Sequence, residues 1–450
     1  MCYNTFIMKR YVEENSIEEK EKFRVTEKDQ DVEFSKEKLK AVSYDVYAFF
    51  RNLLFAVVLG LGIGAYATGF ALLINWITGF RTAHSWLILL LPIGGLAIVG
   101  FYHLLGSYSP KGTNRVLESI SSDEQLPLKM TPLITVGTAI THFFGGSAGR
   151  EGAALQIGGS IGMWFGKTLR LDKREITVMT LCGMSAAFSA MFGTPFTAAV
   201  FAMEVVSIGI LHYSAFVPCV VSSLTAGLIA KWIGYVPEAY PQIDFPSFGW
   251  LNGLQTVGLA IACAVVSILF CIILHKTEHI YQKAVPNAYL RAVVGGFLIV
   301  LLTVCIGSAD YNGAGVPVIM NAVSGQAHWY AFLLKMIMTA LTLGACYKGG
   351  EIIPTIFVGA TFGCVFAPLL GLSAPVGAVL GICGVFCGVT NCPIASICLC
   401  LELFGLKGLP LYIIAAAVSY RLSGYYGIYT GQKIMYSKSR PLFINRTTWK

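Results

Sequence analysis

The sequence predicts an all-α integral membrane protein, and three features of its composition carry this prediction. Hydrophobic residues make up 55% of the 450 positions, charged residues make up 12%, and the mean hydropathy is +0.67. A soluble domain carries roughly 25% charged residues, so most of this chain is expected inside a lipid bilayer. The charge is unevenly spread: the first 51 residues hold 11 acids and 10 bases, whereas the other 399 hold 13 acids and 22 bases.

The charged N-terminal segment forms a separate part of the chain. Residues 1–44 lack the apolar core of a secretory signal peptide and are expected to form a cytosolic arm. The bases of the remaining sequence are scattered among apolar residues and form no stripe, so no nucleic-acid partner is expected. The same composition excludes a soluble enzyme and a disordered regulator.

The 13 cysteines indicate neither a disulfide framework nor a metal site. Their number is odd, and nearly all of them lie in apolar runs. The densest group has no Cys-x-x-Cys pair and no nearby His, which a tetrahedral zinc site would need. That group consists of Cys383, Cys387, Cys392, Cys398 and Cys400. We expect these side chains to pack between helices, and we expect no metal and no cofactor.

Apolar stretches separated by short polar breaks follow one another from residue 48 onward, and we interpret them as membrane helices. They are Leu53–Ile77, Leu87–Leu105, Met130–Phe144, Ile176–Met191, Ala198–Ile210, Phe216–Ile233, Leu254–Leu274, Ala292–Ile306, Tyr330–Cys346, Ile352–Leu370, Val376–Val389, Ile394–Phe404 and Leu409–Val418. Several are shorter than the roughly 20 residues that a full span needs. Short helices broken by Gly and Pro occur in membranes only where protein or a wet cavity surrounds the broken backbone, which indicates a transport pathway.

The membrane region repeats one pattern. Glu151 lies in Gly-Arg-Glu-Gly, 44 residues before Pro195, and Glu351 lies in Gly-Gly-Glu, 42 residues before Pro393. Matched glycine-interrupted segments in two halves are typical of transporters whose substrate lies between the repeats.

Each of these prolines opens a short apolar segment that ends nine residues later in a carboxylate, at Glu204 or at Glu402. We expect these two carboxylates to hydrogen-bond to helix ends in a structural role. The pattern predicts a first membrane repeat at 45–245, a second at 246–432 and a short cytosolic tail at 433–450.

Both glycine-rich segments precede a helix start. Gly145–Gly152 contains four glycines and a serine just before an apolar helix expected from about Ala153, and Lys348–Pro354 is arranged similarly. The unpaired amides and the positive dipole end of a helix form a site for an anion. Two such ends facing one point could hold a dehydrated anion without a fixed charge that would trap it.

Glu151 and Glu351 stand where the anion would lie. In an ordinary helix an acid in the first turn only complements the helix dipole. An intramembrane carboxylate beside broken helices is a functional candidate instead, because it competes with an anion when ionised and hydrogen-bonds to one when protonated. We therefore interpret both residues as groups that gate the anion path or transfer protons. His142 is expected to be a packed helix residue.

Several segments resemble the CLC family of anion channels and anion/proton antiporters. The stretch Gly149–Gly162 looks like the gating-glutamate motif of that family, and Phe192–Val200 and Gly427–Tyr429 are similar to further family segments. The resemblance covers about residues 45–432. It implies an inverted repeat of short, tilted and broken transmembrane helices, in a multi-pass homodimer of the plasma membrane with a cytoplasmic N-terminal arm.

Three departures from the chloride pattern resemble the fluoride/proton antiporter branch. Lys111–Arg115 replaces a Gly-Ser-Gly-Ile-Pro loop, and Gly350–Pro354, which reads Gly-Glu-Ile-Ile-Pro, replaces Gly-Ile-Phe-Ala-Pro. Val205 stands where proton-coupled chloride members have an internal glutamate. At two positions the chain differs from that branch too, because the branch often has Met at the place of Thr113 and Thr at the place of Ile353.

The resemblance implies a secondary transporter that exports fluoride in exchange for protons, with Glu151 as gate and proton-transfer group and Glu351 as proton-transfer and selectivity group. The anion-binding residues it implies are Thr113, Asn114, Gly149, Arg150, Gly152, Gly350, Ile352, Ile353 and Tyr429. The expected partners are fluoride or chloride, protons and the lipid bilayer. A CLC-type chloride/proton exchanger or chloride channel remains the alternative.

Two other classes of protein, an intramembrane enzyme and a membrane scaffold, fit the sequence less well. An intramembrane serine protease would need a His paired with Ser147, and no His occupies a suitable helix position. A His-Glu-x-x-His zinc motif is absent from the sequence. A membrane scaffold would not need two matched breaks at Glu151 and Glu351. The chain is therefore not expected to be an enzyme.

Overall fold

The computed structural model describes residues 46–106, 112–121, 126–440 and 442–448. The predicted N-terminal arm, 1–44, lies outside these residues. Residues 46–55 group as one compact unit and residues 56–448 belong to a second, which contains every element below except the first ten residues of the helix Val46–Ala83.

The described chain is mostly helical. A first long helix covers Val46–Ala83. The helices that follow are η1 (Ser85–Leu90), α2 (Leu91–Leu104), α3 (Gly112–Ser121), α4 (Met130–Phe143), α5 (Glu151–Thr168), α6 (Lys173–Phe192), α7 (Pro195–Glu204), η2 (Tyr213–Ala215), α8 (Phe216–Ile233), α9 (Trp250–Ala284), α10 (Ala288–Ile306), α11 (Val316–Val323), α12 (Ala331–Gly344), α13 (Ile352–Phe366), η3 (Ala367–Leu370), α14 (Ala374–Thr390), α15 (Pro393–Phe404), η4 (Leu406–Gly408) and α16 (Leu409–Leu422).

The described helices differ in their capacity to cross a membrane. Seven are long and apolar enough for a full span, and they include the 38-residue helix Val46–Ala83 and the 35-residue α9. Others, such as α7 with 10 residues and α15 with 12, are too short to cross alone. The mixture of full spans and short helices agrees with the broken-helix pattern expected from the sequence.

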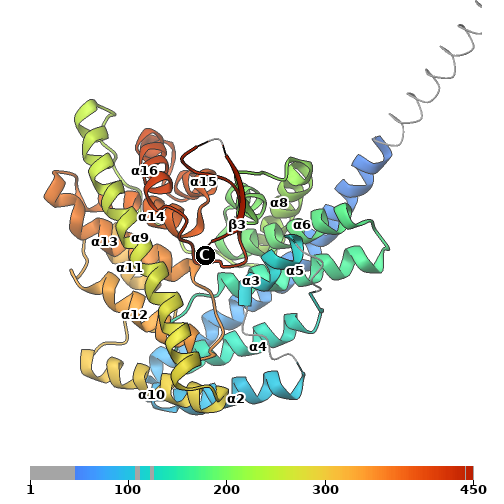
Figure 1. Cartoon of the computed structure of the whole chain (residues 1–450), viewed down its shortest axis with the longest axis horizontal. Helices are drawn as coiled ribbons and strands as arrows, with labels where there is room; N and C mark the ends of the chain where they lie inside the picture. The colour runs from blue at the N-terminus through green and yellow to red at the C-terminus, as the bar shows by residue number, and fades with distance from the viewer. Residues whose placement is uncertain (1–45, 107–111, 122–125, 441, 449–450) are drawn as a thin grey trace, which may run out of the picture. The chain divides into compact units, whose positions relative to one another are not determined.

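Two helix pairs form the densest packing of the molecule. Helices α5 and α6 lie against each other in one half, and α13 and α14 lie against each other in the other half (Figure 1). A Cβ added at Gly158 of α5 would lie 2.1 Å from the Gly183 carbonyl oxygen of α6. A Cβ at Gly363 of α13 would lie 2.0 Å from the Gly377 carbonyl oxygen of α14. Glycine therefore allows backbone-to-backbone contact at both crossings.

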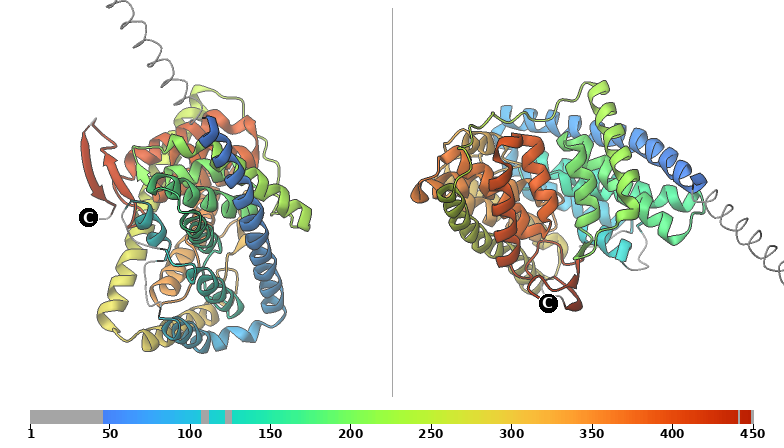
Figure 2. Two further views of the ribbon diagram at one scale, coloured as in Figure 1. Left: turned by 90° about the vertical axis from the view of Figure 1, so that its right-hand side faces the viewer. Right: turned by 90° about the horizontal axis from the view of Figure 1, so that it is seen from above.

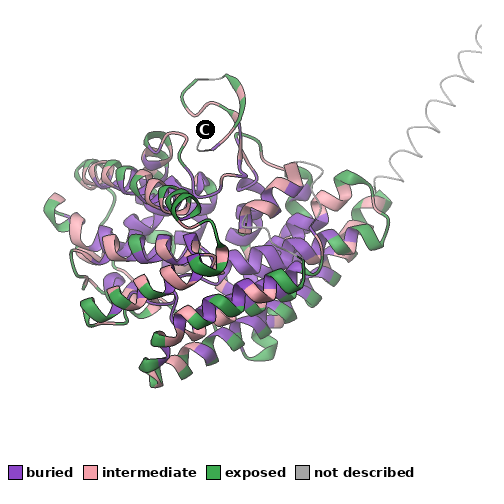
Figure 3. Ribbon diagram, turned by 60° about the horizontal axis from the view of Figure 1, so that its bottom comes forward, coloured by how far each residue is buried: buried purple, intermediate pink, exposed green. Residues whose placement is uncertain are grey.

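The buried residues of α5, α6, α13 and α14 form the core around the glycine-rich segments. Figure 3 shows buried positions in purple concentrated on the inner helices, and exposed positions in green on the outer turns. Large apolar side chains such as Trp232 and Trp250 are more than four-fifths exposed. Outward-facing tryptophans suit a surface that contacts lipid.

The two repeat carboxylates cap each other's helices, as the sequence predicts. Glu204, at the end of α7, accepts hydrogen bonds from the Ile394 and Ala395 amides of α15, at 3.1 and 2.8 Å. Glu402 of α15 accepts from the Phe196 and Thr197 amides of α7, at 3.0 and 2.7 Å. Each carboxylate thus satisfies two amides that the start of a helix leaves without partners.

The predicted helix Ala198–Ile210 is wrong at its end, because α7 stops at Glu204. The chain turns there and forms the short strand β1 (Ser207–Ile208), which pairs in parallel with β2 (Lys433–Tyr436). A third strand, β3 (Phe443–Thr447), lies antiparallel to β2 at the edge of the helices (Figure 2). An apolar run with two β-branched residues at 205–206 does not reveal this strand from sequence, because its partner lies more than 200 positions away.

Candidate functional site

The helices α5 and α13 begin at a common point. The segments that precede them pair through an antiparallel bridge between Gly149 and Gly350. The two amides and two carbonyls of this bridge form reciprocal hydrogen bonds of 2.8 Å. The sequence predicts two glycine-rich helix starts facing one point, and the described structure brings them into direct backbone contact.

Glycine is required at this contact because no side chain would fit. A Cβ at Gly350 would lie 2.4 Å from the Gly152 amide nitrogen, and one at Gly152 would lie 2.8 Å from the Gly350 Cα. A Cβ at Gly149 would lie 2.6 Å from a Glu151 carboxylate oxygen. The bare backbone lets the first amides of both helices, including those of Ile352 and Ile353, gather around one region.

Glu151 is the first residue of α5 and is almost fully buried, at 3% exposure. Its Oε2 accepts a hydrogen bond of 2.9 Å from the Arg150 amide, and its Oε1 lies 3.6 Å from the Arg150 Nε. The carboxylate is therefore turned back onto the helix start, where an anion bound to the same amides would also lie. Such a side chain closes the position to an anion.

Glu351 stands at the corresponding position before α13 and has a different environment. Its Oε2 is buried and has no hydrogen-bond partner among the described residues. The same oxygen would lie 3.5 Å from a Cβ at Gly152, so it faces the start of α5. A buried carboxyl oxygen without a partner is costly unless it is protonated or meets a ligand or water.

Thr113 and Gln156 adjoin the bridge from α3 and α5. Thr113 Oγ1 lies 3.4 Å from the Gly152 carbonyl oxygen, and Gln156 Nε2 donates to that carbonyl at 3.2 Å and to Thr113 Oγ1 at 3.4 Å. Gln156 Oε1 is buried without a partner among the described residues. The sequence analysis missed Gln156, although its position four residues after Gly152 places it on the same helix face.

Two further residues named from the sequence occupy distinct roles. Asn114 Oδ1 accepts a hydrogen bond of 3.1 Å from the Gly431 amide, so its side chain holds the segment that follows Tyr429. Tyr429 is 1% exposed, and its hydroxyl has no partner among the described residues. Its neighbours Ile428 and Thr430 line the same cavity as Glu351.

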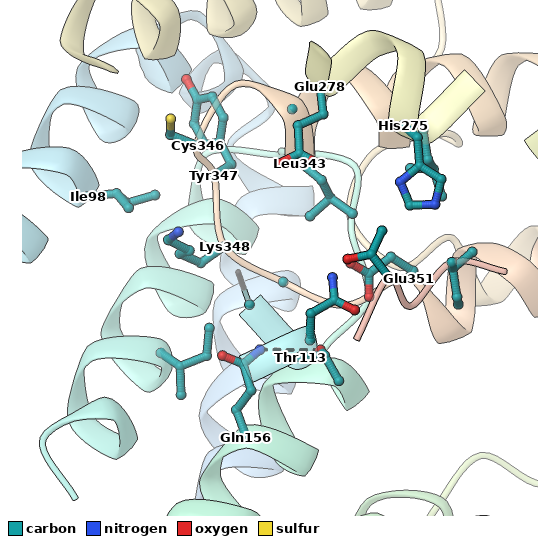
Figure 4. A pocket seen from close by; sticks show the side chains of 18 of the residues that line it. Ile98, Thr113, Gln156, His275, Glu278, Leu343, Cys346, Tyr347, Lys348 and Glu351 are labelled. Atoms are coloured by element: carbon teal, nitrogen blue, oxygen red, sulfur yellow. Dashed lines mark hydrogen bonds between the residues drawn. The ribbon is translucent and has the colours of Figure 1, made fainter. Parts of the chain in front are cut away.

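A cavity of about 320 Å³, the Glu351 cavity, leads to the bridge. Its polar lining includes Thr113, Asn114, Gln156, His275, Glu278, Gln282, Arg291, Lys348, Glu351 and Thr430. Figure 4 shows Glu351 and the bonded pair Gln156 and Thr113 around this cavity. Acidic and basic side chains both line this cavity. No sequence motif predicts the roles of His275, Glu278 or Lys348, because they come from the end of α9 and from the segment before Gly349.

A second cavity of about 690 Å³, the Arg81 cavity, is lined in part by Arg150, the residue before Glu151. The Arg150 guanidinium donates to Asn75 Oδ1 and to the Tyr235 hydroxyl at 3.0 Å, and it forms an ion pair of 3.5 Å with Glu238. These partners hold the chain segment that precedes α5 in place. A direct contact between Arg150 and an anion stays a prediction.

The arrangement joins two glycine-rich helix starts and the carboxyl groups of Glu151 and Glu351 at one place, which we call the constriction. Cavities reach both segments of the constriction, one beside Glu351 and the other beside Arg150. Amide donors can replace part of the hydration of a small anion, and a carboxyl group can leave the site, or donate to the anion, when it takes up a proton. The geometry suits movement of an anion through a protein interior.

Comparisons with known proteins agree with this geometry. The model of a family described as voltage gated chloride channel matches residues 94–424. A chloride/fluoride channel protein of Pseudomonas syringae pv. tomato is 34% identical over 398 residues, which are 87% of this chain and 88% of that protein. A solved structure of a CLC-type fluoride/proton antiporter matches with a TM-score of 0.83 and 32% identity, over 86% of this chain and 99% of that one.

The fold recurs in a more distant structure, a slow cyanobacterial Cl⁻/H⁺ antiporter, with a TM-score of 0.73 at 19% identity over 83% of this chain and 94% of that one. Fold and site define a multi-pass membrane protein that transports anions. The chain belongs to the CLC family, whose members are ion channels and transporters rather than enzymes.

Proposed function

We propose that this CLC protein is a fluoride/proton antiporter that exports fluoride in exchange for protons. The observation that carries the proposal is the Glu351 carboxyl group, which has a buried oxygen without a partner in the described part of the chain and stands between a cavity and the paired helix starts. Fluoride is small, strongly hydrated and a strong hydrogen-bond acceptor, so its dehydration needs strong donors nearby. A protonated Glu351 supplies such a donor and a proton at the same place.

Glu151 acts as the gate in this proposal. When ionised, its carboxylate occupies the amides at the start of α5, and when protonated it releases them to the anion. Val205 stands at the position of the internal glutamate of chloride/proton members, so protons reach the site by another route. We assign that route to Glu351 and the Glu351 cavity.

The remaining roles follow from the same arrangement. The amides at Gly149, Gly152, Gly350, Ile352 and Ile353 hold the anion, and the hydroxyls of Thr113 and Tyr429 supply further donors. Arg150 and Asn114 contribute positive potential and shape to the path. The two membrane repeats, 45–245 and 246–432, each supply one helix start, and the protein functions as a homodimer in the plasma membrane with its N-terminal arm in the cytoplasm.

The test is fluoride efflux and proton uptake in liposomes that contain the full chain, with two variants of Glu351. Glu351→Gln keeps a hydrogen-bond donor but cannot exchange a proton, so fluoride flux should be partly retained while coupled proton uptake is lost. Glu351→Ala removes the donor as well, so fluoride turnover should fall at least about tenfold, the effect of ~1.4 kcal/mol. Chloride flux should fall less in both variants.

Asp244→Asn is the matched control, because the Asp244 side chain is 97% exposed and its removal also deletes one carboxylate. Its fluxes should equal those of the parent. Parent-like fluoride turnover and proton coupling in Glu351→Ala, with the protein folded and monodisperse, would remove Glu351 from the mechanism and with it the fluoride proposal.

The second candidate is a chloride channel or chloride/proton exchanger. Thr113 and Ile353 favour it, because the fluoride branch often carries Met and Thr at these positions. Equal efflux rates for fluoride and chloride would support this candidate, and a fluoride flux without proton movement would indicate a channel.

A further inference from the structure

The Arg81 cavity contains a guanidinium group that the anion path described above does not use. Arg81 lies near the end of the helix Val46–Ala83 and lines the cavity together with His142, Asn312 and the start of α11. Among the described residues no carboxylate lies within ion-pair distance of Arg81, and its buried Nε has no hydrogen-bond partner. An unpaired cation that is only partly exposed to solvent is unfavourable and attracts an anion.

Two glycines hold this guanidinium close to the backbone. A Cβ at Gly145 would lie 3.4 Å from Arg81 Nη1, and a Cβ at Gly313 would lie 3.1 Å from Nη2. Both glycines have positive φ, 83° and 58°, which other residues rarely adopt. Two separate loops therefore fix the position of the Arg81 guanidinium, which does not move freely like a surface side chain.

The loop that carries Gly313 is itself fixed by a buried lysine. Lys335 of α12 is fully buried and donates to the Tyr311 and Gly313 carbonyls, at 3.1 and 2.7 Å. Its ammonium also lies 5.1 Å from the centre of the Phe357 ring of α13. Lys335 adds positive charge behind Arg81 and joins the cavity wall to the helix that begins beside Glu351.

The acids that line the cavity do not neutralise Arg81. Glu238 forms its ion pair with Arg150, and Asp310 is exposed to solvent. His142 is 2% exposed, its Nδ1 donates to the Thr138 carbonyl at 3.0 Å, and its Nε2 has no partner among the described residues. Unpartnered polar atoms on two sides of a cavity fit a hydrated ion better than the acyl chain of a lipid.

We propose that the Arg81 cavity is an anion-binding site of its own, in which the Arg81 guanidinium binds a small halide next to the Arg150–Glu151 segment. The site uses a charged donor, whereas the constriction uses backbone amides. It therefore binds hydrated halide with little discrimination, and selection between halides takes place at the constriction. Captured halide raises the local anion concentration next to the gate.

The first test is crystallographic and uses bromide as the probe on the full chain. We expect an anomalous bromide peak within hydrogen-bonding distance of Arg81 Nη1 or Nη2, and fluoride or chloride added in excess should remove it. No peak in crystals at saturating bromide would overturn the proposal. Loss of the peak when a phospholipid is added would also overturn it, because the occupant would then be a lipid phosphate.

The second test measures flux in liposomes with Arg81→Gln. The half-saturating fluoride concentration on the side of the Arg81 cavity should rise about tenfold, with the maximal rate nearly unchanged, because the gate and constriction are intact. Arg81→Lys should recover part of the affinity. Lys231→Gln removes an exposed charge at the end of α8 and serves as control.

The outcomes separate this site from the constriction. A bromide peak together with an unchanged half-saturating concentration in Arg81→Gln would mean binding at crystal concentration only, which contradicts the proposal. If Arg81→Gln does not fold, the bromide experiment on the unaltered chain still decides. The Glu351 variants test the constriction independently, so failure at Arg81 leaves the antiporter proposal standing.

Discussion

Glu151 and Glu351 occupy equivalent places in the two halves but have different partners. The Glu151 carboxylate is held by the Arg150 amide and guanidinium, whereas one Glu351 oxygen has no partner among the described residues. The first therefore has a defined closed position, and the second is available to a ligand. Equivalent sequence positions thus carry different parts of one proposed cycle.

Glu151→Gln should abolish proton-driven transport without unfolding the protein. Glutamine has nearly the shape of the protonated carboxyl group but cannot ionise, so the gate stays in one state. The measurement is proton movement against a pH gradient in liposomes, driven by fluoride. If the folded variant still moves protons at the parental ratio to fluoride, Glu151 only complements the helix dipole.

The sequence predicts which residues gather at the two helix starts better than it predicts their contacts. The spacing of Glu151 and Glu351 in two glycine-rich motifs was sufficient to predict two helix starts at one point. It could not reveal the bridge between Gly149 and Gly350, because contacts between residues 201 positions apart depend on the packing of everything between them. Arg81 was missed for the same reason, since its glycine neighbours come from two distant loops.

The reciprocal caps between α7 and α15 join the two halves at the level of helices. The nine-residue interval from each proline to its carboxylate predicts this role, because the carboxylate of one helix then reaches the start of the other. The two caps differ in their surroundings: Glu204 is 8% exposed, whereas Glu402 lies at an exposed position. A hydrogen bond at a buried carboxylate is costlier to lose, because water replaces it less easily.

Glu204→Ala should therefore destabilise the protein more than Glu402→Ala. The Glu204 carboxylate is buried, so water replaces it less easily than the exposed Glu402 carboxylate, and each donor left without a partner costs about 1–3 kcal/mol. Thermal unfolding of both variants in the same detergent measures the difference. Equal losses of stability would show that exposure does not decide the strength of these caps.

Helix boundaries were predictable only where the apolar pattern matched the helix length. The predicted Phe216–Ile233 agrees with α8, because polar or glycine residues flank it on both sides. The short helices α3 and α11 were not predicted, since 10 and 8 residues give little periodicity to detect. Tertiary contacts, rather than local pattern, decide these elements.

Glycine crossings determine how closely the whole molecule packs. Gly363→Ala should lower the thermal stability strongly, because its Cβ would lie 2.0 Å from the Gly377 carbonyl and the backbone of two core helices would have to separate. Overpacking of this kind costs about 1–3 kcal/mol or more. Gly100→Ala on α2 is the control, because no atom lies within 4 Å of its added Cβ. Similar melting temperatures for the two variants would contradict a close-packed crossing.

The direction of coupled transport is the property of the whole molecule that most clearly separates an antiporter from a channel. Because the proposed cycle exchanges fluoride for a proton, an outward fluoride gradient should drive protons into the liposome even against an opposing pH gradient. An acidic exterior should accelerate fluoride efflux, since it supplies the proton that is exchanged inward. A channel dissipates each gradient independently and cannot concentrate protons.

Simultaneous recording with a fluoride electrode and an internal pH dye, with the membrane potential clamped by valinomycin and potassium, measures both fluxes. Fluoride efflux without proton accumulation under these conditions would contradict the antiporter and leave an anion channel built on the same helix starts.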